Sequence, residues 1–180
     1  MSELKMTVET RLPKLSTLSL VTMGLLMALQ LVIKSFSVGP AFLKFSFTFL
    51  IAALVAWLFG PWWGMMTAAV VDVIGTLMSG GPFFIGFTIS AVLGSLIYAL
   101  FLYGKPVSWP RLIIAQVIIS VVVNALLNTL WVAIMYKTPF WGLFPVRLLK
   151  QVIMTPIQVV LLYALFKSHM VNLIQKRLNL

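Results

Sequence analysis

Few side chains in this sequence could carry acid–base or metal chemistry. Its 180 residues include three acids, one histidine and no cysteine. Only one of the acids, Asp72, falls within an apolar run. A single buried carboxylate supplies neither the acid and base of a hydrolase nor the ligand cluster of a metal site. The sequence therefore predicts no catalytic residue, no metal site and no enzyme activity. A membrane-embedded enzyme stays open as an alternative that would need chemistry elsewhere.

Asp72 is nevertheless a candidate for a functional role. An acid inside a membrane span is costly unless it is paired or faces water. Asp72 could form an ion pair with a basic residue, carry a proton or sodium ion, or accept hydrogen bonds from a ligand. The second possibility corresponds to a stand-alone secondary transporter driven by an ion gradient.

The other chemically capable side chains are cationic. Thirteen Lys and Arg residues give a formal net charge of +10. They are scattered between apolar runs and form no basic face, so membrane lipid is the expected partner and nucleic acid is not. Lys34, Arg147 and Lys150 lie within or beside apolar runs, where a cation costs about 2.5–3.5 kcal/mol near a helix centre unless it snorkels. These three either snorkel or bind an anionic ligand through charge-assisted hydrogen bonds.

The elements that position these residues are six apolar runs. The chain is 62% hydrophobic, with a mean hydropathy of +1.10, whereas soluble domains contain roughly 45–50% apolar residues. The runs lack the apolar–polar alternation that is typical of a membrane barrel. We therefore predict an all-α membrane protein, with residues 1–180 forming one bundle of six transmembrane helices. The predicted spans are 15–36, 45–59, 64–79, 85–103, 112–135 and 148–166.

The positive charges predict the orientation of the bundle. With a cytoplasmic amino terminus, eight basic residues fall on the cytoplasmic side and five on the outer side, as the positive-inside rule requires. Both termini are therefore predicted to be cytoplasmic. The outer connections are then residues 37–44, 80–84 and 136–145. The five outer cations are Lys34, Lys44, Lys137, Arg147 and Lys150.

Polar and small side chains add detail to the spans. Asn124 and Asn128 are four residues apart, so they share a helix face in the outer half of the fifth span. Gly24 and Ala28 form a small-xxx-small pair, which allows close approach of another helix. The sixth span adds inward hydrogen-bonding capacity at Gln151, Thr155 and Gln158.

The chain contains no nucleotide-binding loop of the form G-x-x-x-x-G-K-[ST]. Gly104 and Lys105 are followed by Pro106, and Ala99 stands where the first glycine would be. An ATPase that drives this protein would therefore be a different chain.

Three stretches together resemble the folate-specific S components of energy-coupling-factor (ECF) vitamin transporters. Residues 72–102 read DVIGTLMSGGPFFIGFTISAVLGSLIYALFL and resemble the third span, outer loop and fourth span of that family. Residues 128–158 read NTLWVAIMYKTPFWGLFPVRLLKQVIMTPIQ and resemble its fifth-to-sixth-span region. The basic R-L-P-K at 11–14 also fits. Ile85 stands where the family suggests a proline, and Gly24 with Ala28 replace its Ala-xxx-Ala motif.

The resemblance implies a folate-binding subunit of an importer in a prokaryotic plasma membrane. In that family the S component captures the vitamin from outside and releases it inward with a transmembrane coupling protein and two ATPases. It is a multi-pass membrane protein with no cofactor. We predict that Gly24 and Ala28 meet the coupling protein. An S component for another vitamin, such as riboflavin or thiamine, is the nearest alternative, although cationic thiamine fits the outer positive charges poorly.

The predicted ligand, folate or a reduced or substituted folate, lies between the outer halves of the helices. Arg147 and Lys150 lie near its carboxylates. Asn128 or Asp72 offers polar contacts to its pterin ring. The other predicted ligand contacts are Lys44, Phe84, Phe87, Thr88 and Trp131.

Overall fold

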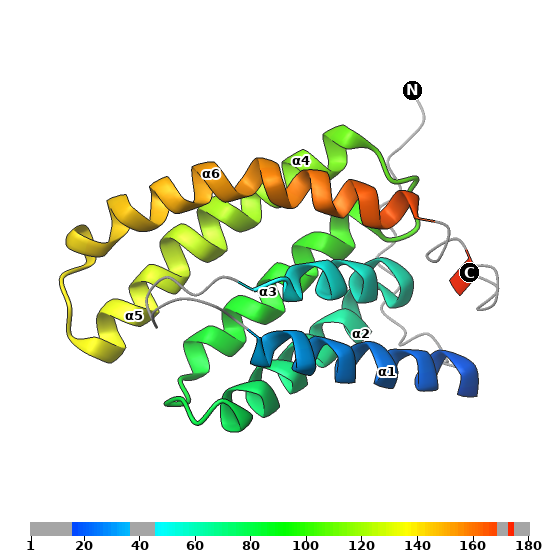
Figure 1. Cartoon of the computed structure of the whole chain (residues 1–180), viewed down its shortest axis with the longest axis horizontal. Coiled ribbons are helices and arrows are strands. Elements are labelled where there is room, and N and C mark those ends of the chain that lie inside the picture. Colours follow the sequence, from blue (N-terminus) through cyan, green and yellow to red (C-terminus); the bar gives the residue numbers. More distant parts are fainter. Residues whose placement is uncertain (1–15, 37–45, 169–172, 175–180) are drawn as a thin grey trace.

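The computed structural model describes residues 16–36, 46–168 and 173–174, and all regular elements in these ranges are helical (Figure 1). Five helices in the described ranges are long and apolar enough to cross a membrane. The predicted all-α class is therefore confirmed for this part of the chain. The elements are α1 (Thr17–Ser35), α2 (Thr48–Met78), α3 (Ile85–Leu102), α4 (Trp109–Ile118), η1 (Ile119–Leu127), α5 (Asn128–Tyr136) and α6 (Phe140–Lys167).

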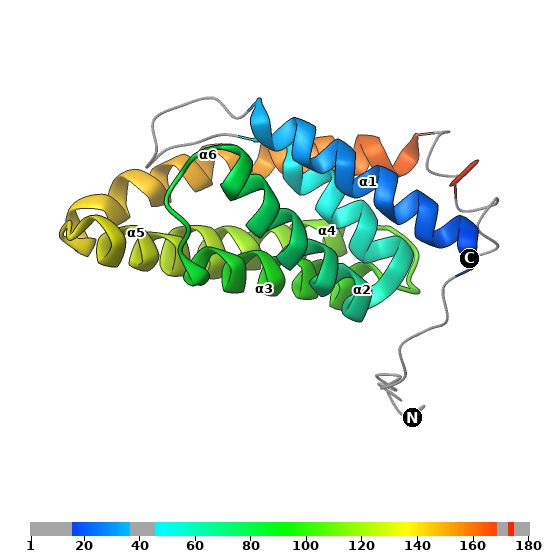
Figure 2. The same ribbon diagram turned by 90° about the horizontal axis from the view of Figure 1, so that it is seen from below.

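α2 contains the second and third predicted spans and reverses direction between them (Figures 1 and 2). Gly60 adopts φ 79° and ψ −174°, a conformation that glycine reaches without steric cost. The next residue is Pro61, which lacks a backbone N–H. Thr48 and Thr76 line the same cavity, although a straight helix would separate them by about 42 Å. α2 is therefore a hairpin of two arms, residues 48–59 and 61–78.

The fifth predicted span is one continuous rod made of α4, η1 and α5, which runs antiparallel to α6 (Figure 1). Its middle segment, η1, is π-helical. The rod begins at Trp109, where Ser108 is the N-cap residue, and ends at Lys137, which has a left-handed backbone with φ 52°.

α6 begins at Phe140, eight residues before the predicted start of the sixth span. The prediction assigned residues 136–145 to a connection because proline disrupts helix interiors. In the structure Pro139 caps α6, and Pro145 lies in the second turn of the helix. Membrane helices tolerate such a proline because neighbouring groups satisfy the freed carbonyl. As a result Arg147 lies within a helix and not at its edge.

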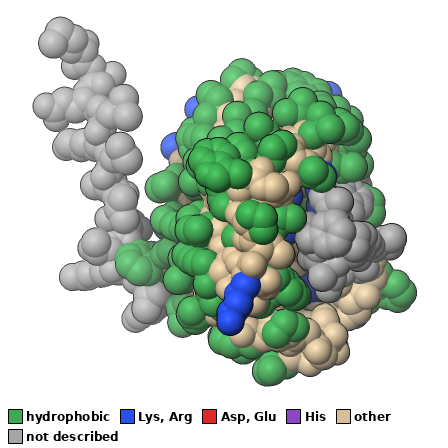
Figure 3. Space-filling view, turned by 90° about the vertical axis from the view of Figure 1, so that its left-hand side faces the viewer, with side chains coloured by type: hydrophobic (Ala, Val, Ile, Leu, Met, Phe, Trp, Pro, Cys, Tyr) green, Lys and Arg blue, Asp and Glu red, His purple; other side chains and the backbone are tan. Residues whose placement is uncertain are grey.

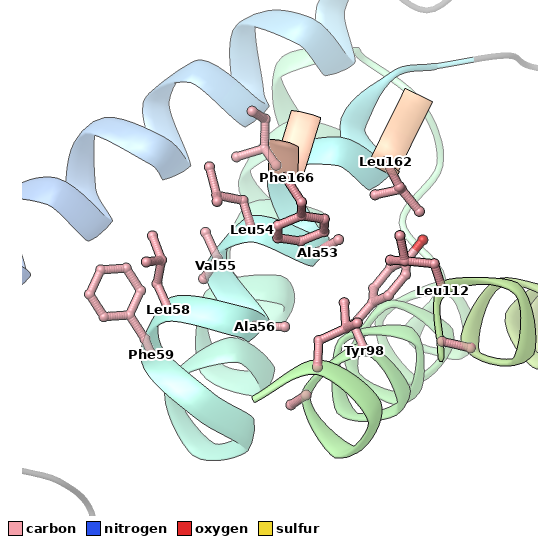
Figure 4. Packing of buried hydrophobic residues seen from close by; sticks show 14 of the residues in the cluster. Ala53, Leu54, Val55, Ala56, Leu58, Phe59, Tyr98, Leu112, Leu162 and Phe166 are labelled. Carbon is pink, nitrogen blue, oxygen red and sulfur yellow. The ribbon is translucent and has the colours of Figure 1, made fainter. Parts of the chain in front are cut away.

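Buried apolar side chains gather at one end of the bundle, where α1, the first arm of α2, α3, α4 and α6 meet (Figure 4). Ala53, Leu102, Leu112 and Leu162 each have 0% of their surface exposed. We call this end the packed half. It is defined by Leu54, Val55, Leu58, Phe59, Ala99, Leu102, Leu112, Ala115, Leu162 and Phe166.

The turn at Gly60 lies in the packed half and is held by close contacts. The ring of Tyr103 lies against Gly60, and a Cβ there would be 2.9 Å from its Cζ atom. The two arms of α2 also touch, because a Cβ on Gly64 would lie 3.2 Å from the Cα of Ala56. The hairpin is therefore packed too tightly for larger side chains at these glycines.

Candidate functional site

Two adjoining cavities lie in the bundle: the larger is at the end opposite the packed half, and the smaller reaches inward to Tyr98, Ile119 and Val123 of the buried apolar cluster. Their volumes are about 420 and 270 Å³, a size that suits a small molecule. Lys34, Asp72, Phe87, Asn128 and Gln158 border both of them. We call this end the cavity half. It is defined by Lys34, Thr48, Phe49, Asp72, Thr76, Phe84, Phe87, Asn124, Asn128, Arg147, Lys150, Gln151, Met154 and Gln158.

The surface around this end is mostly apolar. Figure 3 looks onto the end of the molecule where α5 and α6 are joined, and hydrophobic side chains cover most of the described surface. Basic side chains appear there at a few points. The few basic side chains seen on this face are therefore set in a largely apolar surface.

One face of α6 supplies two cations of the larger cavity. Arg147, Lys150, Gln151, Met154 and Gln158 all line it, and their spacing places them along one side of a helix. The predicted pair Arg147 and Lys150 thus faces the same space. The described lining residues carry three cationic groups and one carboxylate. The cavity is therefore net positive and suits an anionic ligand.

Asp72 forms an ion pair across the wall of the cavity. Lys34 at the end of α1 places its Nζ 2.9 Å from Asp72 Oδ1 and 3.1 Å from the Asp72 carbonyl oxygen. Thr88 Oγ1 donates to Asp72 Oδ2 at 2.9 Å. Gly75 leaves room for Lys34, since a Cβ there would lie 2.6 Å from Lys34 Cδ. The ion-pair role predicted as one possibility for Asp72 is observed, and its contact with a ligand stays a prediction.

Thr88 stands behind this pair. It is buried and borders neither cavity. Its hydroxyl orients the carboxylate of Asp72, so the structure gives it an indirect place beside the predicted ligand site.

Asn124 and Asn128 lie side by side, and Asn128 Nδ2 donates to Asn124 Oδ1 at 3.2 Å. Asn128 Oδ1 and Gln151 Oε1 are buried and have no hydrogen-bond partner among the described residues. An unpaired buried acceptor costs about 1–3 kcal/mol. These oxygens therefore suit a ligand or water molecule that donates an N–H or O–H group. Asn124 also lies in η1, and π-helical segments often occur at functional sites.

Phe84 and Phe87 form an aromatic wall of the larger cavity. Their ring centroids are 6.1 Å apart, and Phe84 is 5.8 Å from the ring of Trp131. Trp131 borders neither cavity, and its Nε1 donates to Ser90 Oγ at 3.0 Å. Gly86 permits this packing, because a Cβ there would lie 2.5 Å from both rings. Trp131 therefore supports Phe84 from behind the wall.

A buried hydrogen-bond chain at the cavity floor goes beyond the sequence prediction. Tyr98 OH donates to Gln116 Oε1 at 2.5 Å, and Gln116 Nε2 donates to Gln158 Oε1 at 2.6 Å. The sequence predicted an inward Gln158 but did not single out Gln116. An isolated glutamine within an apolar run is the signal that could have found it, because such side chains bond across membrane helices.

The remaining predicted residues lie elsewhere. Lys44 is outside the described residues. Lys137 is exposed and lines neither cavity. Gly24 and Ala28 lie on the exposed side of α1, and a Cβ on Gly24 would meet no atom within 4 Å. Their contact with a partner stays a prediction.

Binding is the chemistry that this arrangement supports. Within the described ranges no group of three or more His, Cys, Asp or Glu residues could hold a metal ion. Asp72 already accepts hydrogen bonds from Lys34 and Thr88. The cations, amide oxygens and aromatic rings that line the cavities remain available to contact a ligand.

The sequence matches a known family of membrane transport proteins. Residues 18–170 match the family described as the ECF transporter, substrate-specific component. This chain is an S component of the ECF transporters. The folate transporter FolT of Leuconostoc mesenteroides subsp. mesenteroides is 37% identical to this S component over 174 residues, which cover 92% of this chain and 94% of the relative. The folate transporter FolT of Clostridium novyi is 35% identical over 150 residues, covering 82% and 87%.

Solved structures agree with this assignment. A crystal structure of FolT bound with folic acid matches this S component with a TM-score of 0.79 and 38% identity, covering 83% of this chain and 93% of that chain. A structure described as the S component of a bacterial ECF transporter matches with a TM-score of 0.53 and 22% identity, covering 83% and 97%. The second match supports the fold alone. The family predicted from the sequence is confirmed, and this S component is a membrane protein.

Proposed function

We propose that this S component binds folate for an ECF importer. The observation that carries the proposal is its likeness to the FolT structure with folic acid. The cavity agrees with that ligand. Arg147 and Lys150 suit the carboxylates of the glutamate tail, and Phe84 with Phe87 suits the planar rings. Asn128 Oδ1 suits N–H groups of the pterin. Reduced or substituted folates fit the same arrangement.

The proposed topology has six crossings with both termini in the cytoplasm. The α2 hairpin supplies two of the crossings, although its first arm is short. One cavity is bordered by the end of α1, both ends of α2, the start of α3, the end of α5 and residues 147–158 of α6. Six alternating crossings by one domain place these ends on the same side of a plasma membrane. The positive-inside rule makes that side the outer one.

The proposed partners are a transmembrane coupling protein and two ATPase subunits. The S component itself supplies binding and not ATP hydrolysis. Gly24 and Ala28 are the proposed contact with the coupling protein, because small residues on an exposed helix face permit close helix packing.

Folate binding can be tested with the full chain purified in detergent. An absorbance spectrum of the purified protein is expected to show a copurified pterin, and titration calorimetry of ligand-free protein is expected to show saturable folic acid binding. Riboflavin and thiamine serve as matched competitors. Saturable binding of either competitor without binding of folic acid would reject the proposed ligand while leaving the family assignment intact.

The partner face can be tested separately. Replacing Gly24 and Ala28 by leucine is expected to abolish folate uptake by cells and to leave binding by the isolated subunit unchanged. Ala164→Leu is the control, because Ala164 is also a small exposed residue but lies on α6. Assembly with the coupling protein that survives both α1 changes would show that the interface lies elsewhere.

A further inference from the structure

The buried chain Tyr98–Gln116–Gln158 has a defined direction. Tyr98 is 3% exposed, and Gln116 is its hydrogen-bond partner among the described residues. If the phenol accepted a hydrogen bond from Gln116, its own O–H would have no acceptor among the described side chains, which is unfavourable. The 2.5 Å separation also suits an O–H donor better than an N–H donor. The phenol therefore donates, and Gln116 Oε1 accepts.

Tyr98, Gln116 and Gln158 all border the smaller cavity, and Gln158 alone of the three also borders the larger one, so the direction set at Tyr98 passes along the chain to Gln158. Once Gln116 Oε1 is occupied by Tyr98, its Nε2 is the atom that faces Gln158 Oε1, at 2.6 Å. Gln158 Oε1 is then used as an acceptor. Its Nε2, which no other described side chain engages, remains to donate, and Gln158 borders both cavities. At the floor of the site the amide N–H groups of Gln158 therefore point toward the cavities, and the buried link through Gln116 to Tyr98 fixes their orientation.

The same helix fixes how far this donor lies from the cations. Gln158 follows Lys150 by eight residues and Arg147 by eleven on α6, which corresponds to about 12 and 16 Å along the axis. An elongated ligand whose anionic end contacts Arg147 and Lys150 therefore places its opposite end near Gln158.

We propose that Gln158 is a specificity residue that donates a hydrogen bond to the ring carbonyl of a bound pterin, and that Tyr98 and Gln116 are positioning residues that hold its amide in that orientation. The inference rests on the proposed folate function. Under it, folate binds with its ring toward the packed half and its glutamate tail toward Arg147 and Lys150. The site then distinguishes a ring carbonyl, which accepts a hydrogen bond, from a ring amino group, which donates one.

The test compares folic acid with aminopterin, in which an amino group replaces the ring carbonyl. Both dissociation constants are measured by titration calorimetry on the full chain in detergent. The wild type is expected to prefer folic acid. Gln158→Leu is expected to weaken folic acid binding about tenfold and to change aminopterin binding much less. The ratio of the two dissociation constants, which measures the preference, then falls toward one. Tyr98→Phe removes one oxygen and is expected to lower the preference in the same direction by about threefold.

Ser120→Ala is the matched control. Ser120 in η1 and Thr155 in α6 form a second polar link, with 2.7 Å between their hydroxyl oxygens, and neither borders a cavity. This variant loosens the contact between α6 and the rod of α4, η1 and α5, which Gln116 and Gln158 also join. It is expected to leave the preference for folic acid unchanged. Comparing each protein change with both ligands isolates the effect that is specific to the ring carbonyl.

Three outcomes would overturn the inference. One is an unchanged preference in Gln158→Leu, or in Tyr98→Phe if the first variant does not fold. Another is an equal shift in Ser120→Ala. The third is a wild type that binds aminopterin more tightly than folic acid and loses this preference in Gln158→Leu, which would mean that the Gln158 amide is turned the other way. A wild type that binds neither compound would instead reject the proposed folate function.

Discussion

The packed half and the cavity half are built from the same helices but differ in what they bury. In α6, Val159, Leu162 and Phe166 are almost fully buried among apolar neighbours. Within the preceding turns of the same helix, Gln151 and Gln158 line an open cavity. A tightly packed end stabilises the bundle by dispersion and close fit, which is the main source of helix association in lipid. The other end can then keep cations and amides in place without filling the space between them.

The comparison extends to the polar groups. Tyr98 and Gln116, which line only the smaller cavity, bond to each other, whereas Asn128 and Gln151, which line the larger cavity, keep buried oxygens without a partner in the described ranges. Such groups lower stability and gain binding energy when a ligand pairs with them. Changes in the packed half should therefore alter folding first, and changes in the cavity half should alter binding first.

The largest expected effect comes from the turn of the α2 hairpin. Gly60→Val should lower the free energy of unfolding by about 3–5 kcal/mol, because a left-handed backbone strains the new residue and its Cβ meets the Tyr103 ring. Thermal unfolding in detergent measures this loss. Gly80→Val is the control, since Gly80 also has positive φ but a Cβ there meets no atom within 4 Å. Equal losses would show that backbone strain alone acts.

A pair of substitutions on α6 tests the division directly. Leu162→Ala removes a fully buried side chain from the packed half and should cost about 3 kcal/mol of stability. Met154→Ala, on the cavity wall of the same helix, should cost less than about 1 kcal/mol because it opens space that already exists. Chemical unfolding of both variants under one condition compares them. Equal costs would contradict the division into two halves.

Arg147→Ala should act on binding more than on folding. Loss of a charge-assisted hydrogen bond is expected to remove about 1.5–3 kcal/mol of binding free energy, or a factor of ten or more in the dissociation constant for folic acid. Titration calorimetry measures this change. Lys137→Gln is the charge control, because Lys137 is exposed and lines neither cavity. A similar loss in both variants would indicate general electrostatic attraction and not a site contact.

The smallest effect is expected at Trp131, which lies behind the aromatic wall at the border of the cavity half. Trp131→Phe keeps an aromatic ring beside Phe84 but removes the N–H that bonds Ser90. We expect a stability loss of about 1 kcal/mol and unchanged folic acid affinity, measured by thermal unfolding and calorimetry. A clear loss of affinity with intact stability would move Trp131 from the supporting layer into direct contact with the ligand.

Much of the fold follows from the sequence because lipid restricts the choice. Helices are the default in a bilayer, and the loop at Gly80–Gly81 lies between α2 and α3 as predicted. The observed start of α6 differs from the predicted one. A membrane helix can continue through a proline, so Pro145 lies inside α6 and does not mark the boundary between the loop and the helix. The π-helical η1 is not predictable in this way, since residues 119–127 form an ordinary apolar stretch of the fifth run.

The candidate site was predictable in its chemistry and not in its pairings. Arg147 and Lys150 stood out because cations beside apolar runs are costly, and the structure places both at the cavity. The partner of Asp72 could not be derived, since Lys34 is 38 residues away and several cations were available. The link from Gln116 to Gln158 likewise depends on how α4 and α6 rotate against each other.

The short first arm of α2 has a consequence for transport. Its 12 residues rise only about 18 Å, whereas the hydrocarbon layer is about 30 Å thick. The smaller cavity extends along this arm to Ala52, so only residues 53–59, a rise of about 10 Å, separate the cavities from the Gly60 turn. With the topology proposed above, a ligand bound in these cavities would already lie a substantial part of the way across the bilayer, and the buried apolar side chains of the packed half, Phe59 and Phe166 among them, would close the remaining path.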